Sequence, residues 1–331
     1  MAAAYFLRKG GMEVTLFEAK ESLGGVVRHV IPPFRISEDA IEKDAEILRK
    51  MQVDIRCNTK VESLEELKKQ GYTKIVLAVG APVQGSLKLE SGMPKNALEF
   101  LAEFKQTDGN VSLGKYVVVI GGGNTAMDTA RAAKRNAGVE HVYLVYRRTR
   151  RYMPADEEEL VMALEDGVEF KELLSPVKLE NGQLFCKVMQ LSDYDVSGRR
   201  GVTETGETVW VPADTVIAAV GEKVPTDWYQ ANGLAVSEKG RLYVDEKTLK
   251  TSDDNVYAAG DGLYGPATVV EAIRDGRKVA EAIAGEVLAR DFDKLAEEEK
   301  VYAKRGVLKR NRKRQKRQAD AWDARQSVKT A

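Results

Sequence analysis

The chain has 331 residues, of which 43% are hydrophobic and 31% are charged, and its formal net charge is zero. This length is sufficient for two domains, each with its own buried core. The balanced charge gives no overall attraction to nucleic acid or to a membrane surface, and no apolar run approaches the ~20 residues that span a bilayer. We therefore expect a globular, cytoplasmic protein.

Cysteine and histidine are scarce. The chain contains only Cys57, Cys186, His29 and His141, and the two cysteines are far apart in sequence. Their number and spacing exclude a dithiol redox centre, a four-cysteine zinc site and an internal iron–sulfur cluster. We predict no metal site.

The first residues are typical of the second half of a Rossmann unit. A helix is predicted over residues 1–9, and a strand over Glu13–Phe17 leads to Glu18, the position of an acid that binds a ribose. A glycine fingerprint belongs about 20 residues before such an acid, and 17 residues precede Glu18. The chain is thus expected to begin inside the first helix of a dinucleotide-binding domain, without the strand and phosphate loop before it.

Two segments after Glu18 are suited to line a ligand. Leu23–Val27 contains a glycine pair that permits close approach, and the prolines of Ile31–Arg35 favour a stiff, extended segment. Further predicted elements are a helix over 37–51 with Ser37 as its N-cap, a strand over 53–57, a helix over 63–70, and a buried strand over Lys74–Val79 that runs into Gly80.

The most informative stretch is Val117–Arg135. Four apolar residues predict a buried strand, three glycines follow, and an alanine-rich helix begins near Asn124. Gly121-x-Gly123-x-x-Ala126 has the spacing of a Rossmann phosphate-binding turn, and the free N–H groups of the following helix favour an anion. An ordinary structural turn is the alternative interpretation.

Two arginines follow the next predicted strand, Val139–Tyr146. An NAD site has an acid at this position to bind the ribose 2'-hydroxyl, whereas Arg147 and Arg148 can pair with a 2'-phosphate. The sequence therefore favours NADP(H) over NAD(H). The alternative is a solvated basic loop over 147–151.

Later segments extend this pattern. Thr215–Gly221 repeats the apolar strand with Ala-Val-Gly that ends at Gly80, which suggests two duplicated dinucleotide-binding domains; two ordinary buried strands are the alternative. An acidic helix is predicted over Pro154–Gly167. Residues 168–212 are predicted to form short strands in a layer attached to the second domain.

Val256–Gly262 is predicted to deliver Asp261 from a strand into a glycine-flanked turn before a helix over 267–284. Asp261 can bind a ligand hydroxyl or simply cap the turn. Residues 291–331 form a charged tail whose basic run, 304–317, could bind nucleic acid. We favour a solvated tail, since charge runs are usually solvated, and expect no nucleic acid.

In their order, the segments GGVVRHVIPPFRIS, GGGNTAMD, YRRTRRYMPADEEE and AAGDG resemble the NADPH-dependent small subunit of glutamate synthase, and above all the selenate reductase branch of that flavoprotein group. The resemblance covers about residues 1–290. It implies an α/β protein with two Rossmann-like domains: a split FAD domain at 1–110 and 245–290, an NADPH domain at 111–244 between its parts, and a tail at 291–331.

The resemblance also assigns cofactor-binding residues. Glu18 would bind the FAD ribose, Asp261 the ribityl-phosphate side, and residues near the flavin path and ring would be Gly25, Val26, Thr268 and Val269. The NADPH pyrophosphate would be held by Gly121, Gly123, Asn124, Thr125 and Ala126, and its 2'-phosphate by Arg147 and Arg148. Arg35, Gly80 and Gly221 complete the predicted cofactor-binding set.

The implied function is an oxidoreductase that passes electrons from NADPH through FAD to an iron–sulfur partner or segment, or to a large-subunit partner. No acid–base residue is predicted, because the cofactors carry the chemistry. The alternative is a truncated, redox-silent NADP(H)-binding module that acts with a partner. The sequence does not identify the physiological or small-molecule acceptor.

Overall fold

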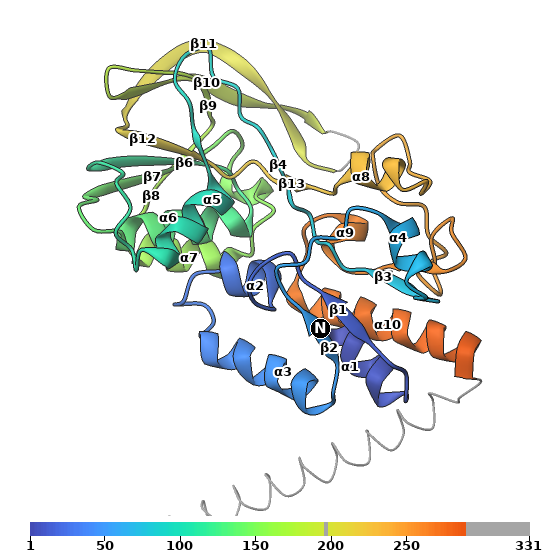
Figure 1. Ribbon diagram of the computed structural model, residues 1–331. Helices are drawn as coiled ribbons and strands as arrows, with labels where there is room; N and C mark the ends of the chain where they lie inside the picture. Colours follow the sequence, from blue (N-terminus) through green and yellow to red (C-terminus); the bar gives the residue numbers. More distant parts are fainter. Residues whose placement is uncertain (195–197, 289–331) are drawn as a thin grey trace, which may run out of the picture. The chain divides into compact units, whose positions relative to one another are not determined.

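The computed structural model describes residues 1–194 and 198–288 (Figure 1). A sheet of five parallel strands runs in the order β5–β12–β6–β7–β8. Its strands are β5 (Lys95–Asn96), β12 (Thr215–Ala218), β6 (Tyr116–Ile120), β7 (His141–Tyr146) and β8 (Glu169–Glu172). The predicted strand before the glycine turn is confirmed as β6, with one partner strand on each side.

The alternation of β6 builds a core on both faces of this sheet. Val117 and Val119 pack with the helices α5 (Ala97–Gln106), α6 (Asn124–Arg135) and α7 (Glu157–Glu165). Val118 and Ile120 pack with residues of the antiparallel strands β9 (Leu174–Glu180), β10 (Gln183–Tyr194) and β11 (Arg200–Pro212). Because both faces are covered, the strand is apolar throughout.

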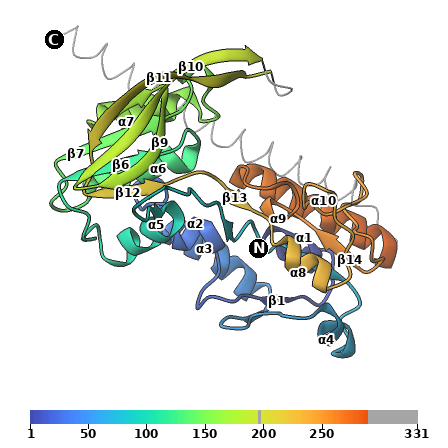
Figure 2. The same ribbon diagram turned by 90° about the horizontal axis from the view of Figure 1, so that it is seen from above.

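The strands of the β9–β11 sheet are longer than the sequence predicted. Short strands were expected over 168–212, but β10 has 12 residues and β11 has 13. Their pairing shifts register between Lys187 and Met189, where a bulge interrupts the apolar alternation. Figure 2 shows the β10–β11 hairpin as a separate layer over β6 and β7, as the sequence predicted for an attached layer.

Two further parallel strand pairs lie outside this sheet, and one of them joins an early segment of the chain to a late one. β3 (Ile75–Leu77) lies parallel to β14 (Val256–Ala258), and β1 (Thr15–Phe17) lies parallel to β2 (Asp54–Arg56). In sequence, β3 precedes all strands of the five-stranded sheet and β14 follows them, so this pair joins the segments that flank the sheet. Met1–Val279 form one compact unit, so the predicted domain boundaries at residues 110 and 244 stay a prediction.

The helices predicted over 1–9, 37–51, 63–70, 154–167 and 267–284 are confirmed within a few residues, whereas those at 25–29, 97–106, 150–152, 226–231 and 261–264 were not predicted. At α3, the predicted cap is confirmed, because the Ser37 hydroxyl accepts a hydrogen bond from the N–H of Ala40 at 3.4 Å. The other elements are α1 (Ala2–Lys9), α2 (Gly25–His29), α3 (Glu38–Lys50), α4 (Leu64–Lys69), η1 (Arg150–Tyr152), α8 (Thr226–Ala231), α9 (Asp261–Tyr264) and α10 (Val269–Leu288), with the two-residue strands β4 (Val83–Gln84) and β13 (Glu222–Lys223). Within the described part of the chain, no helix is both long and apolar enough to cross a bilayer.

One local prediction is wrong. Ile31–Arg35 was expected to be extended, but it forms a turn in which the N–H of Arg35 donates to the carbonyl of Pro32 at 2.9 Å. Two consecutive prolines fix φ without forcing an extended chain, and the hydrogen bond closes the turn. The turn directs Arg35 toward α6 and α7. The predicted tail at 291–331 lies outside the described residues.

Candidate functional site

The glycine turn after β6 is shaped by close packing. A Cβ atom on Gly121 would lie 2.4 Å from the carbonyl oxygen of Ala219 and 2.9 Å from the Cβ of Ala126. Only glycine fits there, and only a small residue at 126 lets α6 approach the turn. These contacts give the predicted turn the steric logic of a Rossmann phosphate loop.

Gly123 stands in a different environment. It is the N-cap of α6, no side chain caps the helix, and nothing lies within 4 Å of the position its Cβ would occupy. The N–H of Ala126 donates to the Gly123 carbonyl at 2.9 Å, and no side-chain hydrogen bond caps the start of the helix. This arrangement fits a pyrophosphate, which would approach Gly123 and accept hydrogen bonds from the helix N-terminus.

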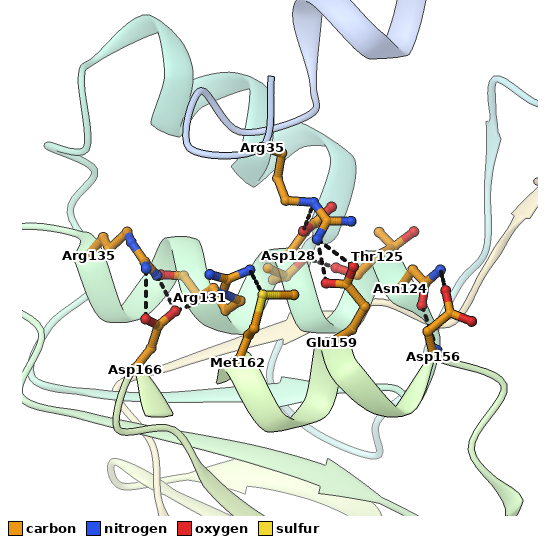
Figure 3. Close-up of polar contacts among 11 residues, drawn as sticks. Arg35, Asn124, Thr125, Asp128, Arg131, Arg135, Asp156, Glu159, Met162 and Asp166 are labelled. Atoms are coloured by element: carbon orange, nitrogen blue, oxygen red, sulfur yellow. Dashed lines mark hydrogen bonds and ion pairs between the residues drawn. The ribbon is translucent and has the colours of Figure 1, made fainter. Parts of the chain in front are cut away.

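The side chains of Asn124 and Thr125 are already engaged by the protein. Asn124 accepts from the N–H of Asp156 at 3.1 Å and donates to the Asp156 carboxylate at 3.3 Å, which ties the start of α6 to the start of α7 (Figure 3). The Thr125 side chain acts on the carboxyl of Glu222 and lowers its pKa, against the larger effect of burial. We therefore expect both residues to contact a nucleotide mainly through their backbone N–H groups.

The two predicted 2'-phosphate ligands differ in exposure. Arg147 is exposed at the end of β7, where a phosphate from solvent can reach its guanidinium. Arg148 is only 7% exposed, and its Nε donates to the backbone carbonyl of Arg200 at 2.7 Å. The geometry therefore favours Arg147 as the phosphate ligand and gives Arg148 a role in joining β7 to β11.

Two of the predicted cofactor-binding residues, Gly80 and Asp261, follow the ends of β3 and β14. Gly80 follows β3, and a Cβ on Gly262 would lie 3.2 Å from the Gly80 carbonyl oxygen, so the two strand ends meet closely. Asp261 accepts a hydrogen bond from the N–H of Ala267 at 3.1 Å, as the capping interpretation predicted, and burial raises the pKa of its carboxyl.

The other residues predicted on this side have mixed environments. Gly25 has φ +52° and nothing within 4 Å of its Cβ position, so a ligand could approach it. The Glu18 carboxylate accepts from the N–H of Lys20 at 2.8 Å. Thr268 is the cap of α10, because its hydroxyl accepts from the N–H of Glu271 at 3.3 Å while the Glu271 carboxylate accepts from the N–H of Thr268 at 3.0 Å.

Exposed valines accompany these glycines. Val79 precedes Gly80 and Val220 precedes Gly221, and both are 43% exposed; Val26 and Val269, themselves predicted site residues, are 48% and 46% exposed. Single exposed apolar side chains are common, but here each one belongs to, or adjoins, the predicted set. Such residues fit a planar apolar ring, so the flavin side is compatible with FAD.

Sequence reasoning missed one acid between the two halves of the site. Glu222 follows Gly221, and both the Thr125 side chain and the charge of Asp261 act on the pKa of its carboxyl. Burial raises the pKa of Glu222, with a further contribution from Asp261. Glu222 thus links the nucleotide turn to the flavin side. The sequence signal that could have identified Glu222 is its position directly after Thr215–Gly221, the repeated strand that ends in glycine.

Arg35 lies on the nucleotide side rather than in open space. It forms ion pairs with Asp128 of α6 and Glu159 of α7 (Figure 3).

No group of three or more histidine, cysteine, aspartate or glutamate side chains in the described ranges is placed to hold a metal ion.

A parallel sheet with a glycine turn at a helix N-terminus, beside a second glycine-lined strand end, defines a dinucleotide-binding oxidoreductase of two Rossmann-like parts. Consistent with this class, the profile described as pyridine nucleotide-disulphide oxidoreductase matches residues 1–276. The chain belongs to this family. The predicted fold class is confirmed, and the predicted relationship is confirmed at the level of the family.

Two curated relatives illustrate the similarity. YgfK of Escherichia coli (strain K12) is 39% identical over 289 residues, which cover 86% of this chain and 28% of YgfK. The glutamate synthase [NADPH] small chain of the same strain is 33% identical over 310 residues, covering 86% of this chain and 65% of the relative. This chain therefore spans less than a third of YgfK and about two thirds of the small chain.

Solved structures share the fold. FprA from Mycobacterium tuberculosis, in complex with NADPH, superposes with a TM-score of 0.69 at 21% identity, over 89% of this chain and 86% of FprA. At this identity the similarity shows the fold alone. The assignment of individual residues to the cofactors stays a prediction.

Proposed function

We propose that the chain is an FAD-dependent oxidoreductase that takes electrons from NADPH and passes them to an iron–sulfur or large-subunit partner. The observation that carries the proposal is the turn at Gly121–Gly123, which combines close packing at Gly121 with open space beside Gly123, the N-cap of a helix that no side chain caps. Exposed Arg147 at the end of β7 supports a 2'-phosphate and hence NADPH.

The flavin side would be formed by the strand ends of β3 and β14. Gly25, Val26, Gly80 and Asp261 would line FAD, and the dipole of α10 would favour negative charge near its N-terminus at Val269. The pairing of β3 with β14 supports a split FAD domain at 1–110 and 245–290, interrupted by an NADPH domain at 111–244.

When bound, the two cofactors supply the hydride chemistry, so the residues of the chain bind and orient the rings rather than exchange protons with a substrate. The two cysteines do not provide an onward path. Both are free thiols, and burial raises the pKa of Cys186 to about 12, which keeps it unreactive at neutral pH. We therefore place the next electron carrier on a partner or on another segment of the protein.

The similarity to a glutamate synthase small chain supports a subunit role. It does not select an acceptor, and the predicted relationship to the selenate reductase branch gains no support from the relatives. We propose the general role of an electron-transferring subunit and leave the acceptor to experiment.

The test is the visible spectrum of the purified full chain after incubation with FAD, followed by anaerobic titration with NADPH. Flavin bands that bleach with NADPH, and less efficiently with NADH, would support the proposal. A chain that binds NADP⁺ but retains no flavin would favour the redox-silent module instead. A chain that binds neither cofactor would refute both interpretations.

A further inference from the structure

The turn between α2 and α3 lies against the nucleotide-binding helix. We call residues 30–36 the strap. Phe34 of the strap packs beneath two guanidinium groups of α6, with its ring centroid 5.0 Å from Arg131 and 4.4 Å from Arg135. Val30 and Phe34 also pack against the apolar core of the five-stranded sheet. The strap is therefore joined to α6 by both apolar and cation–π contacts.

Arg35 adds an ionic link to the same helices. Its Nε lies 3.3 Å from Oδ1 of Asp128, and its Nη1 lies 2.5 Å from Oε1 of Glu159 (Figure 3). The side chains are 28%, 12% and 12% exposed for Arg35, Asp128 and Glu159. Ion pairs this far from solvent are screened less than surface pairs, and losing one partner leaves a buried charge without compensation.

The position of the strap connects the two halves of the site. Its N-terminal neighbour is α2, which begins at Gly25 on the flavin side, and Asp128 lies one turn inside α6, whose N-terminus faces the nucleotide position. A displacement of α6 relative to α2 would break the Arg35 contacts. The strap thus restrains the motion that changes the separation of the two cofactor positions.

We propose that Arg35 is a positioning residue that, with Phe34, holds α6 in register with the flavin side of the chain. This inference rests on the proposed function for its catalytic consequence. It differs from the sequence prediction that Arg35 contacts a cofactor, because Nε and Nη1 of its guanidinium lie against protein carboxylates. Loss of Arg35 is expected to misplace the nucleotide relative to the flavin without removing a nucleotide ligand.

The experiment compares Arg35→Ala, Arg35→Lys and the parent as full chains loaded with FAD. We expect the rate of flavin reduction at saturating NADPH to fall by about 10-fold or more in Arg35→Ala, since small misplacements are costly in such steps. The dissociation constant for NADP⁺ should change by less than about 3-fold, and Arg35→Lys should recover part of the rate because it restores the charge without the fork.

Arg49→Ala is the matched control. Arg49 also bridges two carboxylates, those of Glu42 and Glu46, but all three lie on the exposed face of α3. It should leave the reduction rate unchanged. Two further readouts do not depend on turnover. Hydrogen exchange should increase in α7 and the strap of Arg35→Ala. The fall in melting temperature of the double variant Arg35→Ala/Glu159→Gln should be smaller than the sum of the falls of the two single variants.

The outcomes separate the possibilities. A weaker affinity for NADP⁺ with an unchanged reduction rate would overturn the proposal and make Arg35 a nucleotide ligand. Additive melting shifts with unchanged hydrogen exchange would also overturn it. If the parent chain is not reduced by NADPH at all, the proposed function fails, while the exchange and melting measurements still decide whether the strap holds α6. Should Arg35→Ala fail to fold, Arg35→Lys and Glu159→Gln provide the same comparisons.

Discussion

Replacing Asp128 with asparagine should change how the stability of the protein depends on pH. Only 8% of Asp128 is exposed. The pKa of its carboxyl rises from 3.8 to about 6, chiefly because of burial and partly because of Glu159, against the opposing effects of Arg35 and Arg131. Because of this raised pKa, ionising Asp128 at neutral pH lowers the stability of the folded state by about 3 kcal/mol.

The sign follows from proton binding. Between about pH 4 and pH 6 the folded protein retains a proton at Asp128 that the unfolded chain has released. This group therefore makes the parent less stable as pH rises through that window, and its contribution levels off above it. The Asp128→Asn variant lacks the titration, so its free energy of unfolding relative to the parent should rise by about 2–3 kcal/mol between pH 4 and pH 7.

Urea unfolding of both proteins at several pH values, followed by tryptophan fluorescence, measures this difference. Glu158→Gln, which removes an exposed carboxylate from α7, is the control and should follow the parent at every pH. If the Asp128→Asn curve runs parallel to that of the parent from pH 4 to pH 7, the buried carboxylate does not titrate as the structure indicates, and the reasoning is refuted.

Three further predictions address the nucleotide side. Gly121→Ala places a methyl group 2.4 Å from a backbone carbonyl oxygen and should cost about 1–3 kcal/mol of stability, whereas Gly123→Ala, which meets open space, should keep the parent's melting temperature and weaken NADP⁺ binding. Arg147→Ala should raise the dissociation constant for NADPH by about 10-fold and leave that for NADH unchanged; equal losses for both would contradict its role. Asn136→Ala removes a buried amide that bonds a backbone N–H and C=O at 2.9 and 2.7 Å, and calorimetry should show a loss of about 2–3 kcal/mol.

Local patterns were enough to predict the strand, turn and helix at Val117–Arg135. The signals there are short-range: an apolar run, glycines at fixed spacing, and a small residue at Ala126. Each is imposed by contacts within the same βα unit or with the adjacent β12, so neighbouring residues carry the information. The same holds for the Ser37 cap, whose partner Ala40 is three residues away.

Long-range contacts explain what the sequence left unresolved. Arg147 and Arg148 look equivalent in sequence, but Arg148 is buried because the carbonyl it bonds lies 52 residues later in β11. Arg35 is 124 residues from Glu159, and no residue near Arg35 in sequence indicates that it pairs with the carboxylates of Asp128 and Glu159. Patterns in one segment cannot report which distant segment supplies a partner.

Helix α6 shows how these two levels combine. Its residues 126–133 are all buried, which no amphipathic helix on a protein surface would show, since one face would be solvated. The sheet covers one side and α5 and α7 cover others, while the strap covers Arg131 and Arg135 through Phe34. The alanine-rich sequence is what permits close packing on every side. A helix enclosed in this way holds its N-terminus in one place, so the open position at Gly123 is preformed, and the strap joins this helix to α2, which begins at Gly25 on the proposed flavin side.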